Sequence, residues 1–143
     1  MSFVTIKDQI KVKLETIASI QEVHDFPHQD FGGFPAVTVR TVGNTSDYET
    51  TCENGELYTF ALQCFQNIEG EVHTATAARR IMEVLCDTIR DAFDSDEFLT
   101  GISLPADRTM IGVLPTVSEI YETDNGKYVI ADIEIAVQIS KKI

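Results

Sequence analysis

The side chains of this chain that could do chemistry are a histidine pair, two carboxylate pairs and three cysteines. His24 and His28 are four residues apart, with Asp25 and Asp30 close by. On one face of a helix, such a pair can bind a metal ion. Pro27 stands between the two histidines, and proline disfavours a helix there. A loop could still bring the four groups together, but the pattern as a whole predicts no metal site.

Two carboxylate pairs have a spacing of two residues, Asp47 with Glu49 and Asp132 with Glu134. In a strand this spacing puts both members on one face, where they could act as general acid and base. The chain is rich in carboxylates, so we expect a solvated sheet face for both pairs. No Ser or Thr lies in a nucleophile motif, and no glycine-rich phosphate loop is present. The sequence therefore predicts neither an enzyme nor a cofactor.

Cysteine count and composition favour a reduced, globular protein. Cys52, Cys64 and Cys86 are too few and too scattered for a disulfide framework, so we expect thiols packed as small apolar side chains. The 143 residues, 43% hydrophobic and 24% charged, suit a single domain over 1–143. Apolar runs are too short to cross a membrane, and the first residues lack the apolar centre of a secretory signal.

The net charge of −12 is the most unusual global property of the chain. Proteins that hold nucleic acid or anionic membranes neutralise phosphates with Lys and Arg. The longest basic clusters here are the pairs Arg79-Arg80 and Lys141-Lys142. We expect no tight nucleic-acid binding and no membrane binding.

Two segments have the 3.6-residue apolar period of an amphipathic helix. The first is expected to begin with Thr5 as its N-cap, and the second to span 72–93 and end at the acidic run 94–96. Their apolar stripes are Ile6, Ile10, Leu14, Ile17 and Ile20 in the first, and Ala78, Ile81, Met82, Leu85, Ile89, Ala92 and Phe93 in the second.

Alternation at period two predicts the strands. We expect a short strand at 23–26, one from Pro35 that is broken at Gly43-Asn44, a polar one at 46–53, one at 57–67, one at 110–123 with a potential break at Pro115, and one from Val129. The segment 57–67 is apolar on nearly both faces, which favours a central place in the sheet. Hairpin turns are predicted at Asn54-Gly55 and at 124–126. The fold class is α+β, with two amphipathic helices packed on a mainly antiparallel sheet.

The polar hairpin 44–56 is the first surface that indicates contacts with other chains. It buries no apolar face, so it gains little from the chain's own core and is either a projecting arm or an edge that pairs with something. The candidate interface residues here are Asp47, Tyr48, Glu49, Glu53, Asn54 and Glu56.

A loop that carries Phe26, Phe31 and Phe34 is the second such surface. Three phenylalanines in nine residues are either a satellite core under the loop or an exposed patch for a partner. Phe31 and Phe34 are counted with the interface candidates.

The order of these segments resembles the tail terminator (tail completion) proteins of long-tailed phages, siphophages or myophages. The likeness rests on the leading helix, the strand 34–39, the polar hairpin, the strand 58–65, the helix that contains Ala77-Ala78 and ends at 89–93, and the closing hairpin. It implies a hexameric ring that ends polymerisation of the tail tube and joins a head-side connector or stopper. The implied location is the tail of a virion assembled in the host cytoplasm.

Two alternatives stay open beside this resemblance. One is another head-tail connector or a tail tube subunit, and the other is a small-ligand-binding α+β module. In a tail terminator, DNA passes through the ring without being held, and an acidic lumen would repel the polyanion. The acidic hairpin, with Asp132 and Glu134, is the candidate lining, unless the acid faces outward for solubility.

Overall fold

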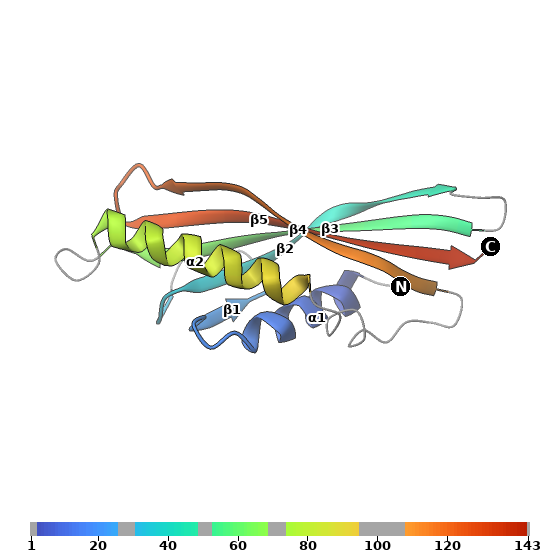
Figure 1. Ribbon diagram of the computed structural model, residues 1–143, viewed down its shortest axis with the longest axis horizontal. Coiled ribbons are helices and arrows are strands. Elements are labelled where there is room, and N and C mark those ends of the chain that lie inside the picture. Colours follow the sequence, from blue (N-terminus) through green and yellow to red (C-terminus); the bar gives the residue numbers. More distant parts are fainter. Residues whose placement is uncertain (1–2, 26–30, 49–52, 69–73, 95–107, 143) are drawn as a thin grey trace.

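The computed structural model describes residues 3–25, 31–48, 53–68, 74–94 and 108–142. It contains a five-stranded sheet in the order β1-β2-β3-β5-β4, in which β1 is parallel to β2 and all other neighbours are antiparallel. The predicted α+β fold is confirmed (Figure 1). The elements are α1 Phe3–Glu15, β1 Glu22–His24, β2 Ala36–Tyr48, β3 Glu53–Asn67, α2 Ala75–Phe93, β4 Arg108–Glu122 and β5 Tyr128–Lys142.

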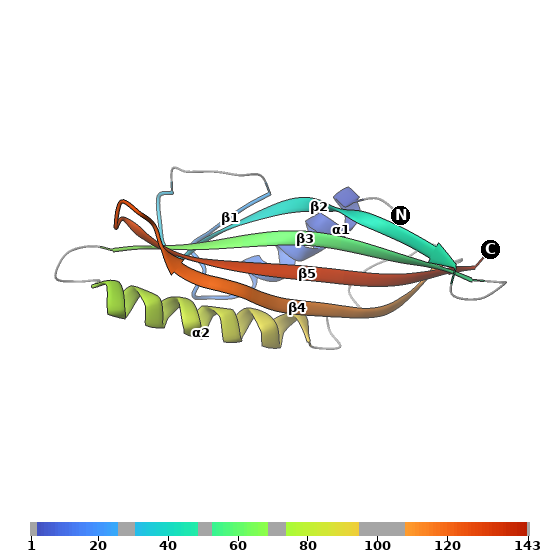
Figure 2. The same ribbon diagram turned by 90° about the horizontal axis from the view of Figure 1, so that it is seen from above.

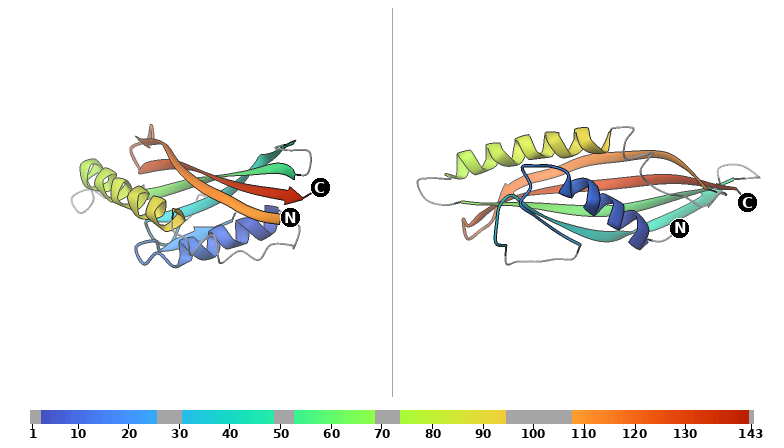
Figure 3. Two further views of the ribbon diagram at one scale, coloured as in Figure 1. Left: turned by 45° about the vertical axis from the view of Figure 1, so that its right-hand side comes forward. Right: turned by 90° about the horizontal axis from the view of Figure 1, so that it is seen from below.

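Both helices of the described residues pack on the same face of the sheet, and neither lies on the opposite face (Figure 3). We call the opposite face the helix-free face. The predicted stripes supply the core, with Ile6, Ile10 and Leu14 fully buried on α1 and Met82 and Ile89 fully buried on α2. The N-cap prediction for α1 was wrong, because the helix already includes Phe3 and Thr5 lies in its first turn.

The second helix has defined ends. The Thr74 hydroxyl accepts a hydrogen bond from the Ala77 amide at 3.2 Å, which satisfies one of the amides that a helix start leaves without a partner. Asp94 closes the helix as its C-cap, at the start of the acidic run that predicted the end.

The central strand is β3, as predicted from its apolar composition. Tyr58, Phe60, Leu62 and Cys64 alternate toward the helices and are buried. On β5 the odd-numbered residues from Val129 to Ile139 are buried in the same way. Period two therefore places one side chain of every pair in the core.

Two predicted interruptions of the strands were wrong. Gly43 does not end β2, because the register shift between Thr41 and Gly43 absorbs one extra residue as a bulge and the strand continues to Tyr48. Pro115 lies within an unbroken β4, paired with Ile135. An edge strand tolerates proline, because the missing amide can face away from the sheet.

The two predicted hairpin turns had different outcomes. Asn54 and Gly55 are strand residues that pair with Tyr48 and Asp47, so no turn lies there, and the connection falls at 49–52, outside the described residues. The turn at 124–126 is confirmed, with Gly126 at φ +68° between the paired Thr123 and Tyr128. A left-handed φ is what favours glycine at this position.

Candidate assembly surfaces

One end of the sheet extends beyond both helices (Figures 1 and 2). We call it the arm, comprising 44–48 of β2 and 53–56 of β3 together with the adjoining ends of β5 and β4. Tyr48 pairs with Asn54, Asn54 with Lys141, and Lys141 with Arg108. The arm is thus four strands wide, and the 53–56 part of the predicted polar hairpin pairs with β5 of the same chain.

The arm carries charges of both signs in a defined order. Glu53 lies opposite Lys142 on β5, whereas Asp47 lies opposite Gly55 on β3. Of the other predicted interface residues, Glu49 lies outside the described residues. The strand order therefore brings the terminal lysine pair to the same end of the sheet as the acidic hairpin.

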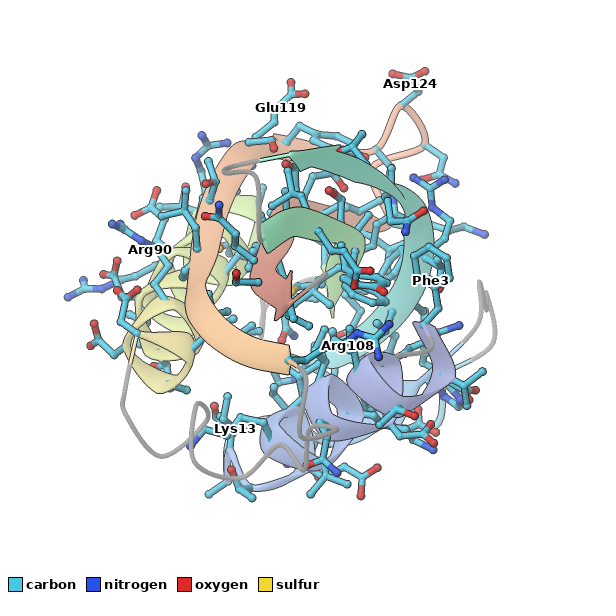
Figure 4. The ribbon with its side chains drawn as sticks, turned by 90° about the vertical axis from the view of Figure 1, so that its right-hand side faces the viewer. Phe3, Lys13, Arg90, Arg108, Glu119 and Asp124 are labelled. Carbon is cyan, nitrogen blue, oxygen red and sulfur yellow. The ribbon has the colours of Figure 1, made fainter. Side chains whose placement is uncertain are left out.

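Glu56 occupies an internal place at the base of the arm. It is 9% exposed, and its carboxylate accepts a hydrogen bond from the Tyr58 hydroxyl at 3.0 Å. The same oxygen lies 3.6 Å from Nε of Arg108, which points inward between β4 and α1 (Figure 4). Burial, followed by the hydrogen bond to Glu56, raises the pKa of Tyr58. Within one chain, Glu56 joins β3 to β4 across β5.

An aromatic cluster lies at the opposite end of the sheet from the arm. Phe31 and Phe34 are half-buried, with their ring centroids 5.8 Å apart. Phe31 stacks on Phe65 at 4.9 Å, and Phe34 on Tyr128 at 5.8 Å. The two predicted phenylalanines therefore belong to a satellite cluster that keeps part of its surface open. Phe26 is outside the described residues.

The loop that carries this cluster is held by Glu22. Its Oε2 accepts hydrogen bonds from the amides of Gly32 at 2.6 Å and Gly33 at 3.1 Å. Its Oε1 lies 3.8 Å from Nε2 of His24. His28 lies outside the described residues, and within them no group of three His, Cys, Asp or Glu could hold a metal.

The helix-free face carries Asp132 and Glu134, as the period-two pattern on β5 implies. Asp132 accepts a hydrogen bond from Gln63 Nε2 at 3.3 Å, and Glu134 is exposed. Burial, followed by the charge of Asp132, raises the pKa of Tyr121. Glu119 of β4 pairs with Asp132 and points away from the helices (Figure 4). The centre of this face is acidic, apart from Arg40.

A groove on the helix side was not predicted from the sequence. It has a volume of about 430 Å³ and lies between the N-terminal half of α2 and the start of β2. We call it the α2 groove. Val84 is 59% exposed and lies outside the buried stripe of α2. An apolar residue outside that stripe is the sequence signal that could have indicated the groove. Its lining residues are Ser19, Pro35, Ala77, Arg80, Ile81, Val84 and Leu85.

The two cysteines that the structure describes lie in the core. Cys64 and Cys86 are buried free thiols, as predicted, and Cys52 is outside the described residues. No helix in the described ranges is long and apolar enough to cross a membrane.

The fold is similar to that of a chain in a solved virion structure. The chain superposes on a chain of the structure described as "Virion of native gene transfer agent (GTA) particle" with a TM-score of 0.59 and 12% sequence identity. The likeness covers 97% of this chain and 99% of the other. No protein-family model and no curated protein sequence matches the chain.

Proposed function

We propose that this chain is a structural protein of a phage-type virion and that it acts as a tail terminator. In this role, six copies form a ring that caps the tail tube, ends its polymerisation and offers a surface to the head-side connector or stopper. The finding that supports this most directly is the fold likeness to a virion chain over nearly the full length of both chains. The proposed location is the tail of a virion assembled in the host cytoplasm.

The architecture agrees with such a role. A sheet that extends past its helices gives a subunit a surface that its own core does not use. In the proposed ring, the acidic centre of the helix-free face, with Asp132 and Glu134, lines the channel. An acidic lining would let DNA pass without being held, because no phosphate-bound counterions are released.

The first test is the native mass of the purified chain. A hexamer of the 15.9-kDa chain has a mass of about 95 kDa and should appear as a closed ring by electron microscopy. Open-ended polymers would indicate a tail tube subunit instead. A monomer that binds small molecules would indicate a ligand-binding module, and either result would overturn the proposal.

The second test separates a terminator from another connector. Purified protein is added to polymerising tail tube protein of the same phage, and tube length is measured by electron microscopy. A terminator added in excess stops elongation and stays at one tube end. A ring that leaves the length distribution unchanged would contradict termination and favour a connector role.

A further inference from the structure

The α2 groove presents an apolar, a cationic and an apolar side chain at successive turns of α2. Ala77, Arg80 and Val84 are three and four residues apart, so they follow one another along one side of the helix. Val84 exposes 59% of its surface. Apart from Arg80 and Ser19, the whole lining is aliphatic or proline. An apolar hollow with one charge is typical of a contact site for another protein.

The outer side of α1 has the same order of side chains with the opposite charge. Val4 and Val12 are 66% and 55% exposed, although valine is usually buried. Asp8 lies midway between them and is also exposed. The spacing of four residues places the three side chains one turn apart, and none of them belongs to the buried stripe of the helix. Anchors at this spacing are what a helix presents to a groove.

Neither of the two charges is used within the described part of the chain. Arg80 and Asp8 are exposed, and neither makes an ion pair with a described residue. Lys11, the cation one turn from Asp8, pairs instead with Glu15 at 3.9 Å. An unpaired cation in the groove and an unpaired carboxylate on α1 can therefore pair between two chains, and such complementary charges determine which surfaces meet.

We propose that the α2 groove binds the outer side of α1 from a second copy of this chain, with Asp8 beside Arg80 and the two exposed valines of α1 beside Val84 and Ala77. The match holds for either direction of the incoming helix, because the valines are placed symmetrically about the carboxylate. The inference rests on the proposed ring and names its subunit contact.

The positions of the two helices suit a contact that closes into a ring. In the view along the long axis, α1 and α2 lie in different sectors of the molecule (Figure 4). One copy can then receive a neighbour in its groove and present α1 to the next neighbour. Such a contact between two different patches is heterologous, and it forms a ring when the rotation between copies fits.

A charge exchange tests the ionic part of the contact. Arg80→Glu should weaken hexamer formation by about tenfold or more, because two like charges then meet, and mass photometry over a dilution series measures this. Asp8→Arg should do the same, and combining both changes should restore most of the assembly. Two single variants that assemble normally, or a combination that fails to rescue, would overturn the contact.

Two controls make the same changes of charge outside the contact. Arg90→Glu alters an exposed position in the C-terminal half of α2. Asp124→Arg alters the exposed turn between β4 and β5, far from α1 (Figure 4). Both should assemble normally, whereas a loss of assembly equal to that of the contact variants would show that only net charge matters.

The apolar part has its own matched pair. Val84→Asp should abolish the hexamer, while Val42→Asp, at a 53%-exposed valine of β2, should leave it intact. Circular dichroism of both variants checks that the monomer is folded. If wild-type rings form and Val84→Asp still forms them, the subunit contact is wrong and the proposed ring stands. If the wild type forms no ring, the proposed function fails, and the contact fails with it.

Discussion

At the scale of single residues, Glu56 is the most consequential polar group in the described part of the chain. Its carboxylate accepts a hydrogen bond from the Tyr58 hydroxyl and forms an ion pair with the Arg108 guanidinium, and the residue is almost fully buried. A buried charge of this kind is costly when its partners are removed, because the remaining groups stay desolvated. Glu56 therefore stabilises the base of the arm, and its carboxylate is not exposed to partners.

Replacing this carboxylate should reduce stability. We expect Glu56→Gln to lower the free energy of unfolding by about 2 kcal/mol, since Arg108 and Tyr58 lose a charged acceptor. Urea denaturation followed by circular dichroism measures the change. Glu134→Gln, at an exposed position of β5, should stay within about 0.5 kcal/mol. Equal effects of the two substitutions would show that Glu56 is not held as described.

The buried thiols make the free energy of unfolding depend on pH in the alkaline range. Burial, with the charges of Asp87 and Glu83, raises the pKa of Cys86 from 9.0 to about 11, and burial raises that of Cys64 well above its ordinary value. The folded chain then holds these protons more tightly than the unfolded chain. Its extra stability is complete below pH 9 and is lost as pH rises through about 11.

The measurement is the free energy of unfolding in urea at a series of pH values from neutral to alkaline. The wild type should lose stability progressively above pH 9, and Cys86→Ala should show a shallower decline. A variant with the same decline as the wild type would mean that this thiol does not contribute.

At the scale of elements, the turn between β4 and β5 depends on one glycine. Gly126 has φ +68°, and a Cβ there would meet no atom within 4 Å, so only backbone strain opposes a side chain. We expect Gly126→Ala to cost roughly 1–2 kcal/mol of unfolding free energy. Gly43→Ala is the matched control, because its surroundings are equally open and its φ is not positive. A comparable loss at Gly43 would contradict this explanation.

The edge strand β4 has features that oppose pairing with a strand of another chain. Pro115 and the two register shifts, between Met110 and Gly112 and between Val117 and Glu119, interrupt the regular row of outward backbone groups. Such features prevent an edge strand from pairing with other chains. This edge is thus poorly suited to strand addition.

At the scale of the whole molecule, the charge of −12 suits the proposed ring, through which DNA would move. If Asp132 and Glu134 line the channel, changing both to Lys should make the ring retain duplex DNA at 150 mM salt. The affinity should fall steeply as salt rises, since bound phosphates release counterions. The wild-type ring should retain none, and fluorescence anisotropy with labelled duplex measures both.

A control with the same charge change separates the channel from net charge alone. Glu83→Lys with Asp91→Lys alters two exposed carboxylates on α2, on the other side of the sheet. DNA retention by both double variants to the same degree would show that the helix-free face is not the lumen. Normal ring formation by each variant is checked by native mass.

The sequence by itself determined the α+β class, the stripe of α2, the stripe of α1 as far as Leu14, the central place of β3 and the turn at Gly126; Ile17 and Ile20 of the first predicted stripe lie beyond the end of α1. These depend on local periodicity and on backbone preferences within a few neighbouring residues. The polar character of the arm segment was also readable, because it lacks apolar residues at every second position. The likeness in element order to tail terminators came from the same local information.

Only the tertiary structure decided how these pieces meet. Gly43 lies at a bulge within β2. Asn54 and Gly55 are strand residues because β3 pairs along its whole length with β5, which is distant in the sequence. Glu56 became internal because strand order brings Arg108 to it across β5. The α2 groove needs three separate segments to form its walls. Register and packing between distant segments are set by the free energy of the whole core, which no local pattern contains.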